Sequence, residues 1–257
     1  MEVMDVRSDR LSQMEQYVLE NRHVSLVEIC QRYGISINTA RRDIKELLKS
    51  GSIIKVYGGV SAADRTNAVP FEVRNEKGDY EKRGIAALAT AYIKENDIVF
   101  IDSGTTTQYI LDYVPEDLSF TVITYSIKVL FAAAARPNIR LVVLPGEFYR
   151  ETNSFCGTDA QKILETYSIH TAFMAATTVS REGLVGNSFA PEYEIKRTAV
   201  ARSYKKVLLI DSTKYGKVSL RAYATLKDFD QVFTGQTVEQ EFCELCEANQ
   251  VEVLQKA

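Results

Sequence analysis

The stretch that decides the fold of the larger part of this chain is DIVFIDSGTTTQYI, residues 97–110. The apolar run at 98–101 predicts a buried β-strand, because short continuous apolar runs are typical of strands covered on both faces. A small, hydroxyl-rich loop at 102–107 follows the run, and a helical apolar pattern comes after the loop. A strand, such a loop and a helix in that order present backbone N–H groups to an anion. The stretch therefore predicts a phosphate-receiving loop in an α/β domain.

Strand-like and helix-like patterns alternate from residue 84 onward. This alternation predicts a parallel or mixed sheet covered by helices on both faces. The predicted strands are 98–101, 119–123, 140–144, 171–175, 206–210, 230–234 and 251–254, and the predicted helices lie around 106–113, 126–136, 158–166, 191–203 and 239–247. Ligands of such sheets bind outside the carboxyl ends of the strands. We expect the loops that follow the strands to line one binding site.

The loops after the strands are rich in hydroxyl groups, and they add glycine, lysine and carboxylates. This set suits a phosphorylated sugar or polyol: N–H groups and hydroxyls bind the phosphate, Lys214 adds a positive charge, and carboxylates such as Glu194 bind sugar hydroxyls. The candidate effector-binding residues are Asp102, Ser103, Gly104, Thr105, Thr106, Thr107, Thr124, Tyr125, Ser126, Gly146, Glu192 and Lys214. The loop has neither the Gly-Lys-Ser/Thr of a Walker A motif nor the three glycines of a dinucleotide fingerprint. Hydroxyl residues after strands also serve simply as helix caps.

Three helical patterns follow one another in the first sixty residues. The second begins at Ser25, an N-cap with Glu28 three residues later, and ends at Gly34. The third is capped by Ser36 and carries one apolar face, formed by Ile37, Ala40, Ile44, Leu47 and Leu48. Its opposite face is basic. Two helices joined by a tight glycine turn, the second basic and amphipathic, predict a helix-turn-helix whose second helix enters the DNA major groove.

Positive charge is concentrated in this part of the chain. Residues 32–60 hold six Lys/Arg and two Asp/Glu, although the formal net charge of the whole chain is −3. The stretch SIIKVYGGV, residues 52–60, predicts a short β-ribbon that acts as a wing. The candidate DNA-binding residues are Ser36, Asn38, Thr39, Arg41, Arg42, Lys45, Lys55 and Tyr57. Basic helix faces are usually only solvated, but the caps, the turn, the basic face and the wing together favour DNA binding.

Length and composition indicate a soluble two-domain protein. The chain has 257 residues, of which 46% are hydrophobic and 25% charged. It shows neither a signal peptide nor an apolar run long enough to span a membrane, so we expect it in the cytoplasm. The predicted organisation is a DNA-binding domain at 1–60, a polar linker at 61–83 and an effector domain at 84–257. Within the linker, VPFEVR (69–74) is expected to add a strand or to dock onto the second domain.

The four cysteines predict neither a disulfide framework nor a metal site. Cys243 and Cys246 form a CxxC, a spacing found in zinc and redox sites. They lie, however, in a segment whose apolar residues have helical spacing, there is no second CxxC, and the chain has only two histidines. We therefore interpret them as core cysteines, and expect neither a metal nor a cofactor.

The two halves together resemble the DeoR family of bacterial transcriptional regulators over nearly the whole length. The resemblance lies in VSLVEICQRYGISINTARRDIKELLKSGSIIKVYGGV (24–60) and in IVFIDSGTTT, TVITYSIKVL, EYEIKR and LLIDSTKYGK. It implies an N-terminal winged helix-turn-helix and an α/β effector domain similar to ribose-5-phosphate isomerase, which senses phosphorylated sugars with the DSGTTT loop and Lys214. The segments VPFEVR, SFCG, FMAAT and YEIK look closest to the branch that represses myo-inositol catabolism genes. Tyr125 departs from the family pattern, which usually has Thr-Asn-Ser where this chain has Thr-Tyr-Ser.

Two functions are compatible with these patterns. The first is a DNA-binding repressor of a sugar or polyol catabolism operon that acts as a dimer or tetramer and is released from operator DNA by a phosphorylated sugar. The alternative is a sugar-phosphate isomerase with an accessory DNA-binding head, for which Asp102, Glu192, Glu194 and Asp211 are candidate acids and bases. No His or Cys of the second domain forms an evident catalytic constellation, and an isomerase does not need the helix-turn-helix. We therefore predict a regulator without enzymatic activity.

Overall fold

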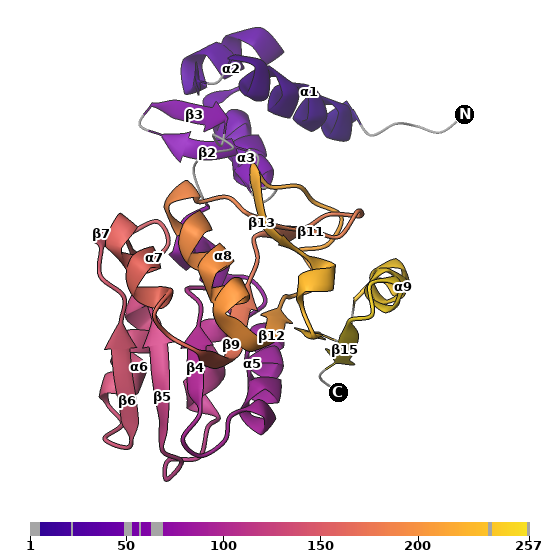
Figure 1. Cartoon of the computed structure of the whole chain (residues 1–257). Helices are drawn as coiled ribbons and strands as arrows, with labels where there is room; N and C mark the ends of the chain where they lie inside the picture. The colour runs from indigo at the N-terminus through magenta and orange to yellow at the C-terminus, as the bar shows by residue number, and fades with distance from the viewer. Residues whose placement is uncertain are drawn as a thin grey trace. The chain divides into compact units, whose positions relative to one another are not determined.

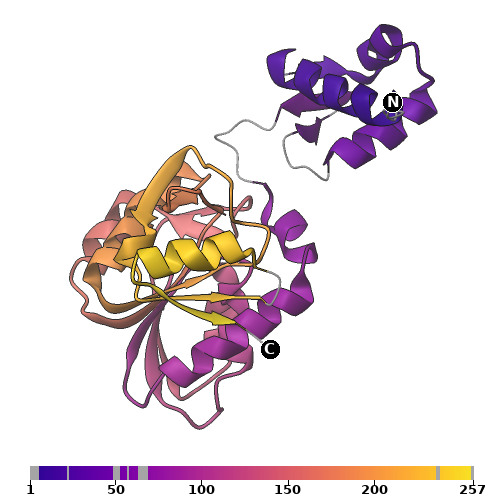
Figure 2. The same cartoon turned by 90° about the vertical axis from the view of Figure 1, so that its right-hand side faces the viewer.

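The computed structural model describes residues 6–21, 23–48, 53–56, 58–62, 69–235 and 238–255. The chain divides into two compact units, Met1–Val69 and Pro70–Ala257, which can be followed by colour along the chain in Figures 1 and 2. Each unit has its own hydrophobic core. Within the described part of the chain, no helix combines the length and the apolar character needed to cross a membrane.

The first unit is a winged helix-turn-helix. Its described elements are α1 (Val6–Asn21), β1 (His23–Ser25), α2 (Leu26–Tyr33), α3 (Ile37–Leu47), β2 (Ile53–Val56) and β3 (Gly59–Ala62). The strands form an antiparallel sheet in the order β1-β3-β2. The predicted ribbon is therefore present, and β1 adds a third strand that the sequence analysis did not predict.

The predicted caps hold the turn between α2 and α3. Ser25 Oγ accepts a hydrogen bond from the Glu28 N–H at 3.1 Å, and Ser36 Oγ accepts one from the Thr39 N–H at 3.2 Å. Gly34 ends α2 with φ of +59°, a left-handed conformation that glycine adopts without strain. The Glu28 carboxylate accepts from the Tyr17 hydroxyl at 2.7 Å. These contacts fix where α3 begins.

An ion pair joins α1 to α3 within this unit. Asp43 of α3 is fully buried, and its Oδ2 accepts from Arg10 Nε at 3.0 Å and from Arg10 Nη2 at 2.9 Å. The hydrophobic core of this unit consists of Met14, Val18, Val24, Ile29, Ala40, Ile44, Leu47, Ile53 and Val60. Burial of a carboxylate is costly unless a charged partner balances it. The pair thus sets the position of α1 against the basic helix.

The second unit contains a seven-stranded, all-parallel sheet in the order β15-β14-β12-β9-β4-β5-β6. The strands are β4 (Ile98–Ile101), β5 (Phe120–Thr124), β6 (Ile139–Val143), β9 (Ile169–Ala175), β12 (Ser203–Leu209), β14 (Gln231–Thr234) and β15 (Glu252–Gln255). All seven coincide with strands predicted from apolar runs, because parallel strands buried on both faces have few polar residues. Consecutive strands extend in one direction from β4 and in the other from β9, so the switch in strand order lies between these two neighbours (Figure 1).

Helices cover both faces of this sheet. One face packs against α5 (Asp79–Leu88), η2 (Ala89–Tyr92), η3 (Thr107–Asp112) and α6 (Ile127–Ala134), and the other against α7 (Thr158–Leu164), α8 (Tyr193–Arg202) and α9 (Gln240–Ala248). Alternate residues of β4 point to opposite faces. Val99 and Ile101 belong to the core on the side of α5, η2, η3 and α6, and Phe100 belongs to the core on the side of α7, α8 and α9. The segment predicted as a helix at 106–113 takes the tighter 3-10 form, which is typical of short helical turns.

Smaller elements were not predicted from the sequence. They are the hairpin β7 (Glu147–Tyr149) with β8 (Ser154–Cys156), the sheet β10 (Thr178–Val179), β11 (Leu184–Asn187) and β13 (Arg221–Thr225), and the turns η4 (Ala190–Glu192) and η5 (Leu226–Asp228). The predicted linker, residues 61–83, contains the helix α4 (Phe71–Glu76) and the start of α5. The expectation of a strand at VPFEVR is wrong and that of docking is confirmed, since Phe71 is fully buried and its N–H donates to Glu151 O at 2.8 Å.

The cysteines of the CxxC lie on α9. Cys246 is fully buried in the core, where burial raises the pKa of its thiol to about 12. Cys243 is half-buried. Among the described residues, no group of three His, Cys, Asp or Glu side chains is arranged to hold a metal ion.

We expect Arg10→Ala to lower the free energy of unfolding of the first unit by about 2 kcal/mol, because it removes the charged donor from a buried carboxylate. Arg42→Ala is the matched control: Arg42 is exposed on the same helix as Asp43, and we expect a change below about 0.5 kcal/mol. Urea unfolding of the full chain, followed by circular dichroism, measures both. Equal effects of the two substitutions would show that the ion pair does not stabilise the unit.

Candidate functional site

The exposed face of α3 carries most of the predicted DNA-binding residues. Asn38, Arg41, Arg42 and Lys45 are exposed on α3, and Lys55 is exposed on β2. Basic side chains on such a face neutralise phosphates or bind guanine edges, and an amide near the helix start reaches base edges. The structure thus brings together the polar surface that the sequence predicted.

Two predicted DNA-binding hydroxyls are engaged within the helix cap. Ser36 Oγ caps α3 and also forms a hydrogen bond with Thr39 Oγ1 at 2.9 Å. Tyr57 lies outside the described residues.

Ile37 was predicted on the buried face of α3, but its side chain is 46% exposed. It occupies the first turn of α3, where the chain has only just left the cap, and an apolar side chain there suits contact with a thymine methyl group.

The predicted effector loop lies at the switch point between β4 and β9. This is the position at which open parallel sheets bind ligands, because the connections leave it in opposite directions. Asp102 directly follows β4, and its Oδ2 accepts from the N–H of Ala175, the last residue of β9, at 2.7 Å. Gly104 packs against the same residue: a Cβ at Gly104 would lie 2.3 Å from the Ala175 Cβ. Glycine is therefore required for the loop to cross this strand end.

Asp102 is the centre of a buried network. It is fully buried, and its carboxylate accepts from the Ser103 N–H at 2.9 Å, from the Tyr125 hydroxyl and from the Lys196 ammonium. Lys196 of α8 also donates to Ala175 O at 3.1 Å. Burial and the neighbouring Asp102 charge raise the pKa of Tyr125 well above its ordinary value, so Tyr125 remains a hydrogen-bond donor. The carboxylate thus organises the site from within rather than facing solvent.

Glu192 forms a second buried node beside the first. Its Oε1 accepts from the hydroxyls of Ser103 at 2.7 Å and Ser154 at 2.9 Å, and its Oε2 accepts from Asn187 Nδ2 at 3.2 Å. Burial, and then the charge of Glu192, raise the pKa of the nearby Cys156 thiol to about 12. One carboxylate therefore joins the loop after β4 to the start of β8 and the end of β11.

The other predicted effector residues support these loops. Thr107 Oγ1 donates to Asp102 O at 2.7 Å, Thr124 Oγ1 donates to Ile101 O at 2.7 Å, and Ser126 Oγ accepts from the Val129 N–H at 3.4 Å as the N-cap of α6. Thr105 and Thr106 are almost completely buried. A Cβ at Gly146 would lie 2.4 Å from the Cys156 carbonyl carbon, so this glycine allows the β7–β8 hairpin to close.

Lys214 lies in the loop after β12. Its Nζ is 3.8 Å from Asp211 Oδ2, and its side chain is 18% exposed. Burial lowers the pKa of Lys214, and the neighbouring Asp211 opposes that shift. Lys214 thus lies beside Asp211 in the loop that follows β12.

Helices α4 and α5 cover the effector loop. Asn75 Oδ1 of α4 accepts from the Tyr109 hydroxyl at 3.1 Å and from Gln108 Nε2, and Gln108 Nε2 also donates to Thr105 O at 2.9 Å. At the start of α5, Asp79 Oδ1 accepts from the Tyr109 hydroxyl at 2.6 Å. A segment that the sequence analysis assigned to the linker thus belongs to the site.

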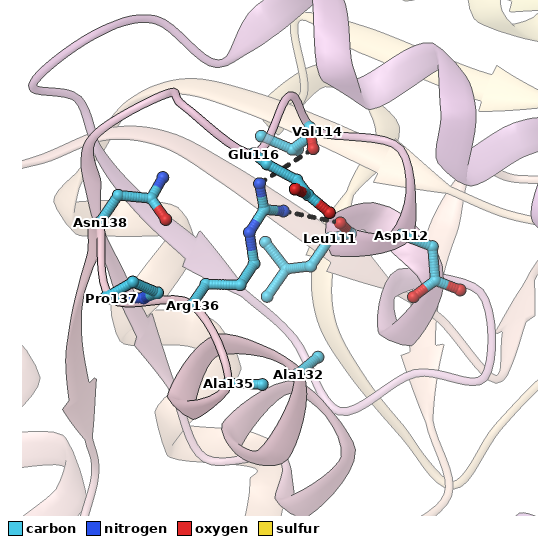
Figure 3. A pocket seen from close by; sticks show the side chains of 9 residues that line it. All are labelled: Leu111, Asp112, Val114, Glu116, Ala132, Ala135, Arg136, Pro137 and Asn138. Carbon is cyan, nitrogen blue, oxygen red and sulfur yellow. Dashed lines mark hydrogen bonds between the residues drawn. The ribbon is translucent and has the colours of Figure 1, made fainter.

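A pocket of about 540 Å³ lies away from this site (Figure 3). Its lining comes from the segments that lead into β5 and β6: Leu111, Asp112, Val114, Glu116, Ala132, Ala135, Arg136, Pro137 and Asn138. Arg136 crosses it and donates to Leu111 O at 2.9 Å and to Val114 O at 3.0 Å. Its guanidinium is thus already engaged by backbone carbonyls.

Several charged residues near the carboxyl edge of the sheet were not predicted from the sequence: Arg74, Lys82, Lys196 and Glu81. Glu81 Oε1 accepts from the Ser212 N–H at 3.0 Å, which ties α5 to the loop after β12. Lys196 stands inside the quoted motif EYEIKR, four residues after Glu192 and therefore on the same helix face. That spacing was the available signal for Lys196. The other three lay in a polar stretch with no such signal.

Comparisons with known proteins identify the family of both units. Two family models match the chain: the DeoR-like helix-turn-helix domain over residues 10–66 and the DeoR C terminal sensor domain over residues 78–236. The HTH-type transcriptional regulator IolR of Bacillus subtilis (strain 168) is 40% identical over 242 residues, which are 94% of this chain and 96% of IolR. The deoxyribose operon repressor of Escherichia coli (strain K12) is 26% identical over 250 residues, 96% of this chain and 98% of the repressor.

Among solved structures, ribose 5-phosphate isomerase A of Methanocaldococcus jannaschii is similar with a TM-score of 0.41 and 17% identity, covering 55% of this chain and 57% of the isomerase. The family resemblance predicted from the sequence is confirmed by the two domain matches.

We expect Lys196→Met to destabilise the second unit by about 3–5 kcal/mol, because it removes the ammonium that balances the buried Asp102 carboxylate. Arg197→Met is the matched control, since Arg197 is 55% exposed and contacts only the exposed Glu194 among the ion pairs of the described chain. Its expected effect is below about 0.5 kcal/mol. The double variant Asp102→Asn/Lys196→Met should recover part of the loss. Urea unfolding monitored by circular dichroism measures the free energy of unfolding of each variant. If the double variant is as unstable as Lys196→Met, the charge-balance explanation is wrong.

Proposed function

The chain belongs to the DeoR family of DNA-binding transcriptional regulators, and we propose that it represses a sugar or polyol catabolism operon and leaves its operator when a phosphorylated sugar binds. One observation carries this proposal. The same chain combines an exposed basic recognition helix with a hydroxyl-rich loop and cations at the switch point of a parallel sheet. A ligand-controlled regulator needs both parts: the basic helix to bind DNA and the loop with its cations to bind the ligand.

The effector is a phosphorylated polyol or sugar. The sequence motifs and the 40% identity to IolR support a compound derived from inositol. Its phosphate is held by the loop 102–107 with Lys214, and its hydroxyls by polar groups around Glu192. Because Asp102 already accepts from four donors, we assign it the role of orienting this loop. Because the hydroxyls of Ser103 and Thr107 donate within the protein, we assign direct contact with the ligand to the N–H groups of the loop, to Thr105 and Thr106, and to Lys214.

The regulator acts in the cytoplasm as a dimer or tetramer. One helix-turn-helix binds one half-site, and two linked half-sites raise a modest affinity through effective concentration. Effector binding favours an arrangement of recognition helices that no longer matches the operator. A coupling of about 1–3 kcal/mol per site is sufficient for such control.

Sugar-phosphate isomerisation is the less favoured function. The candidate bases are already engaged: Asp102 and Glu192 accept several hydrogen bonds each, and Asp211 Oδ1 accepts from the Thr213 N–H at 3.0 Å. The fourth candidate, Glu194, is exposed on α8 and lies 3.7 Å from Arg197. A general base needs an oxygen directed at the substrate's proton. This arrangement supports a sensing site without turnover.

A mobility-shift titration tests the proposal. The full chain is titrated onto DNA from upstream of its own and neighbouring genes, with and without a panel of phosphosugars that includes phosphorylated inositol derivatives. Repression with release predicts a shift that one phosphosugar abolishes, while its unphosphorylated form does not. A shift that no compound changes would refute release by a phosphosugar. Turnover of ribose 5-phosphate by the protein would instead favour the isomerase function.

We expect Arg41→Ala or Arg42→Ala to weaken operator binding by about 1–3 kcal/mol and, where a phosphate contact is lost, to reduce the slope of log affinity against log salt by about one. Lys162→Ala is the control, because Lys162 is 74% exposed on α7 of the other unit. Fluorescence anisotropy at several salt concentrations measures both quantities. An unchanged affinity in both arginine variants would show that the basic face of α3 does not contact the operator.

A further inference from the structure

The pocket of about 540 Å³ in Figure 3 lies between two connections of the second unit. One connection leads from η3 into β5, and the other leads from α6 into β6. The loop 102–107 lies elsewhere, because it follows the end of β4, which pairs in parallel with β5. None of the candidate effector-binding or DNA-binding residues lines this pocket. Its volume is within the range of small-molecule sites, roughly 300–1,000 Å³.

Arg136 extends across the pocket and is held by three backbone carbonyls (Figure 3). Its Nη1 donates to Leu111 O at 2.9 Å, and its Nη2 donates to Val114 O at 3.0 Å and to Pro115 O. The Nε of the same guanidinium is buried, and no group of the described chain accepts its hydrogen. A buried donor without an acceptor costs free energy. The lining therefore carries one fixed N–H that needs an acceptor.

Two carboxylates also line the pocket. Asp112 and Glu116 are both exposed, and Asp112 Oδ2 forms an ion pair with Arg83 Nη1 at 3.2 Å. The two carboxylates are thus matched by two guanidinium groups, those of Arg83 and Arg136. A pocket with balanced charges favours a neutral ligand, because a charged ligand would lose hydration without a net opposite charge to replace it. The ligand must donate to carboxylate oxygens and accept from Arg136 Nε.

Hydroxyl groups meet both requirements, because each has one donor and two acceptor lone pairs. Apart from Asn138, the rest of the lining is apolar and suits the C–H groups of a sugar or polyol: Leu111, Val114, Ala132, Ala135 and Pro137. We propose that this pocket binds a neutral polyol or unphosphorylated sugar, whose hydroxyls accept from Arg136 Nε and donate to Asp112 and Glu116. This second ligand site is independent of the proposed release by a phosphorylated sugar at the loop 102–107.

Asp112 also connects the pocket to the helices that cover the effector loop. Arg83 of α5 binds Asp112 and, through its Nε, Asp79 Oδ2 at 2.9 Å. The Tyr109 hydroxyl lies 2.6 Å from Asp79 Oδ1 and 3.1 Å from Asn75 Oδ1 on α4. A polyol bound to Asp112 therefore contacts a chain of polar groups that ends on α4, the first helix of the second unit.

Saturation-transfer NMR titrations of the full chain test the site with five neutral probes: myo-inositol, sorbitol, glycerol, ribose and glucose. We expect at least one probe to bind with a Kd of about 1 mM or tighter. Inorganic phosphate should not displace it, because the proposed effector site lies elsewhere. No binding of any probe at about 10 mM would overturn the proposal. Displacement by phosphate, or tighter binding of the zwitterion leucine than of any polyol, would overturn it as well.

Matched variants locate the bound probe. Ala135→Phe fills the pocket and should raise Kd at least about tenfold, whereas Ala134→Phe alters the neighbouring exposed residue, which does not line the pocket, and should change Kd less than about twofold. Glu116→Ala removes a charged acceptor and should raise Kd about fivefold, whereas Asp117→Ala, the exposed neighbour outside the lining, should not.

Circular dichroism verifies that each variant is folded. If Ala135→Phe does not fold, the pair Glu116→Ala and Asp117→Ala still tests the site, because both residues are exposed. An unchanged Kd in either folded pocket variant would place the polyol elsewhere and overturn the proposal. Because these titrations use no DNA, their outcome leaves the proposed release from the operator to its own test.

Discussion

The buried ion pair between Asp102 and Lys196 is the interaction on which the effector unit depends. The carboxylate stands at the end of β4, and the ammonium reaches it from α8, 94 residues further along the chain. Between them the N–H and the carbonyl of Ala175 bind to the same two groups, so the end of β9 is held as well. A buried ion pair contributes little net stability over an apolar pair, because both charges lose their hydration. Its effect is to permit only one arrangement of the strand ends.

That arrangement brings the loops next to β4 and β9 close enough to form many hydrogen bonds with one another. The carboxylates of Asp102 and Glu192 accept from the residues that follow β4 and β5 and from residues at the start of β8 and the end of β11, and Ser103 contacts both. Such a network, in which every acceptor has a donor, holds N–H groups and hydroxyls in place before a ligand arrives. A pre-organised site loses less entropy on binding. A sensor benefits from this, since its response depends on binding energy and not on turnover.

The strands of the effector unit were predictable because each is a continuous apolar run, and the caps Ser25, Gly34 and Ser36 were predictable because short-range chemistry decides them. The missed elements have a different cause. Of the six residues of α4 only Phe71 is buried, so the helix has no apolar periodicity, and tertiary contacts alone hold it. Lys82 and Lys196 were missed because charged residues are normally exposed. Only the fold shows that carbonyl and carboxylate oxygens surround them.

Tyr125 departs from the family pattern, which usually has an asparagine at this position. Its side chain is fully buried, the centroid of its ring lies 6.0 Å from that of Phe100, and its hydroxyl donates to Asp102. The tyrosine therefore supports the carboxylate that orders the loop 102–107. A larger residue at this position fills the core beneath the site and supplies a neutral donor, since burial keeps its pKa high.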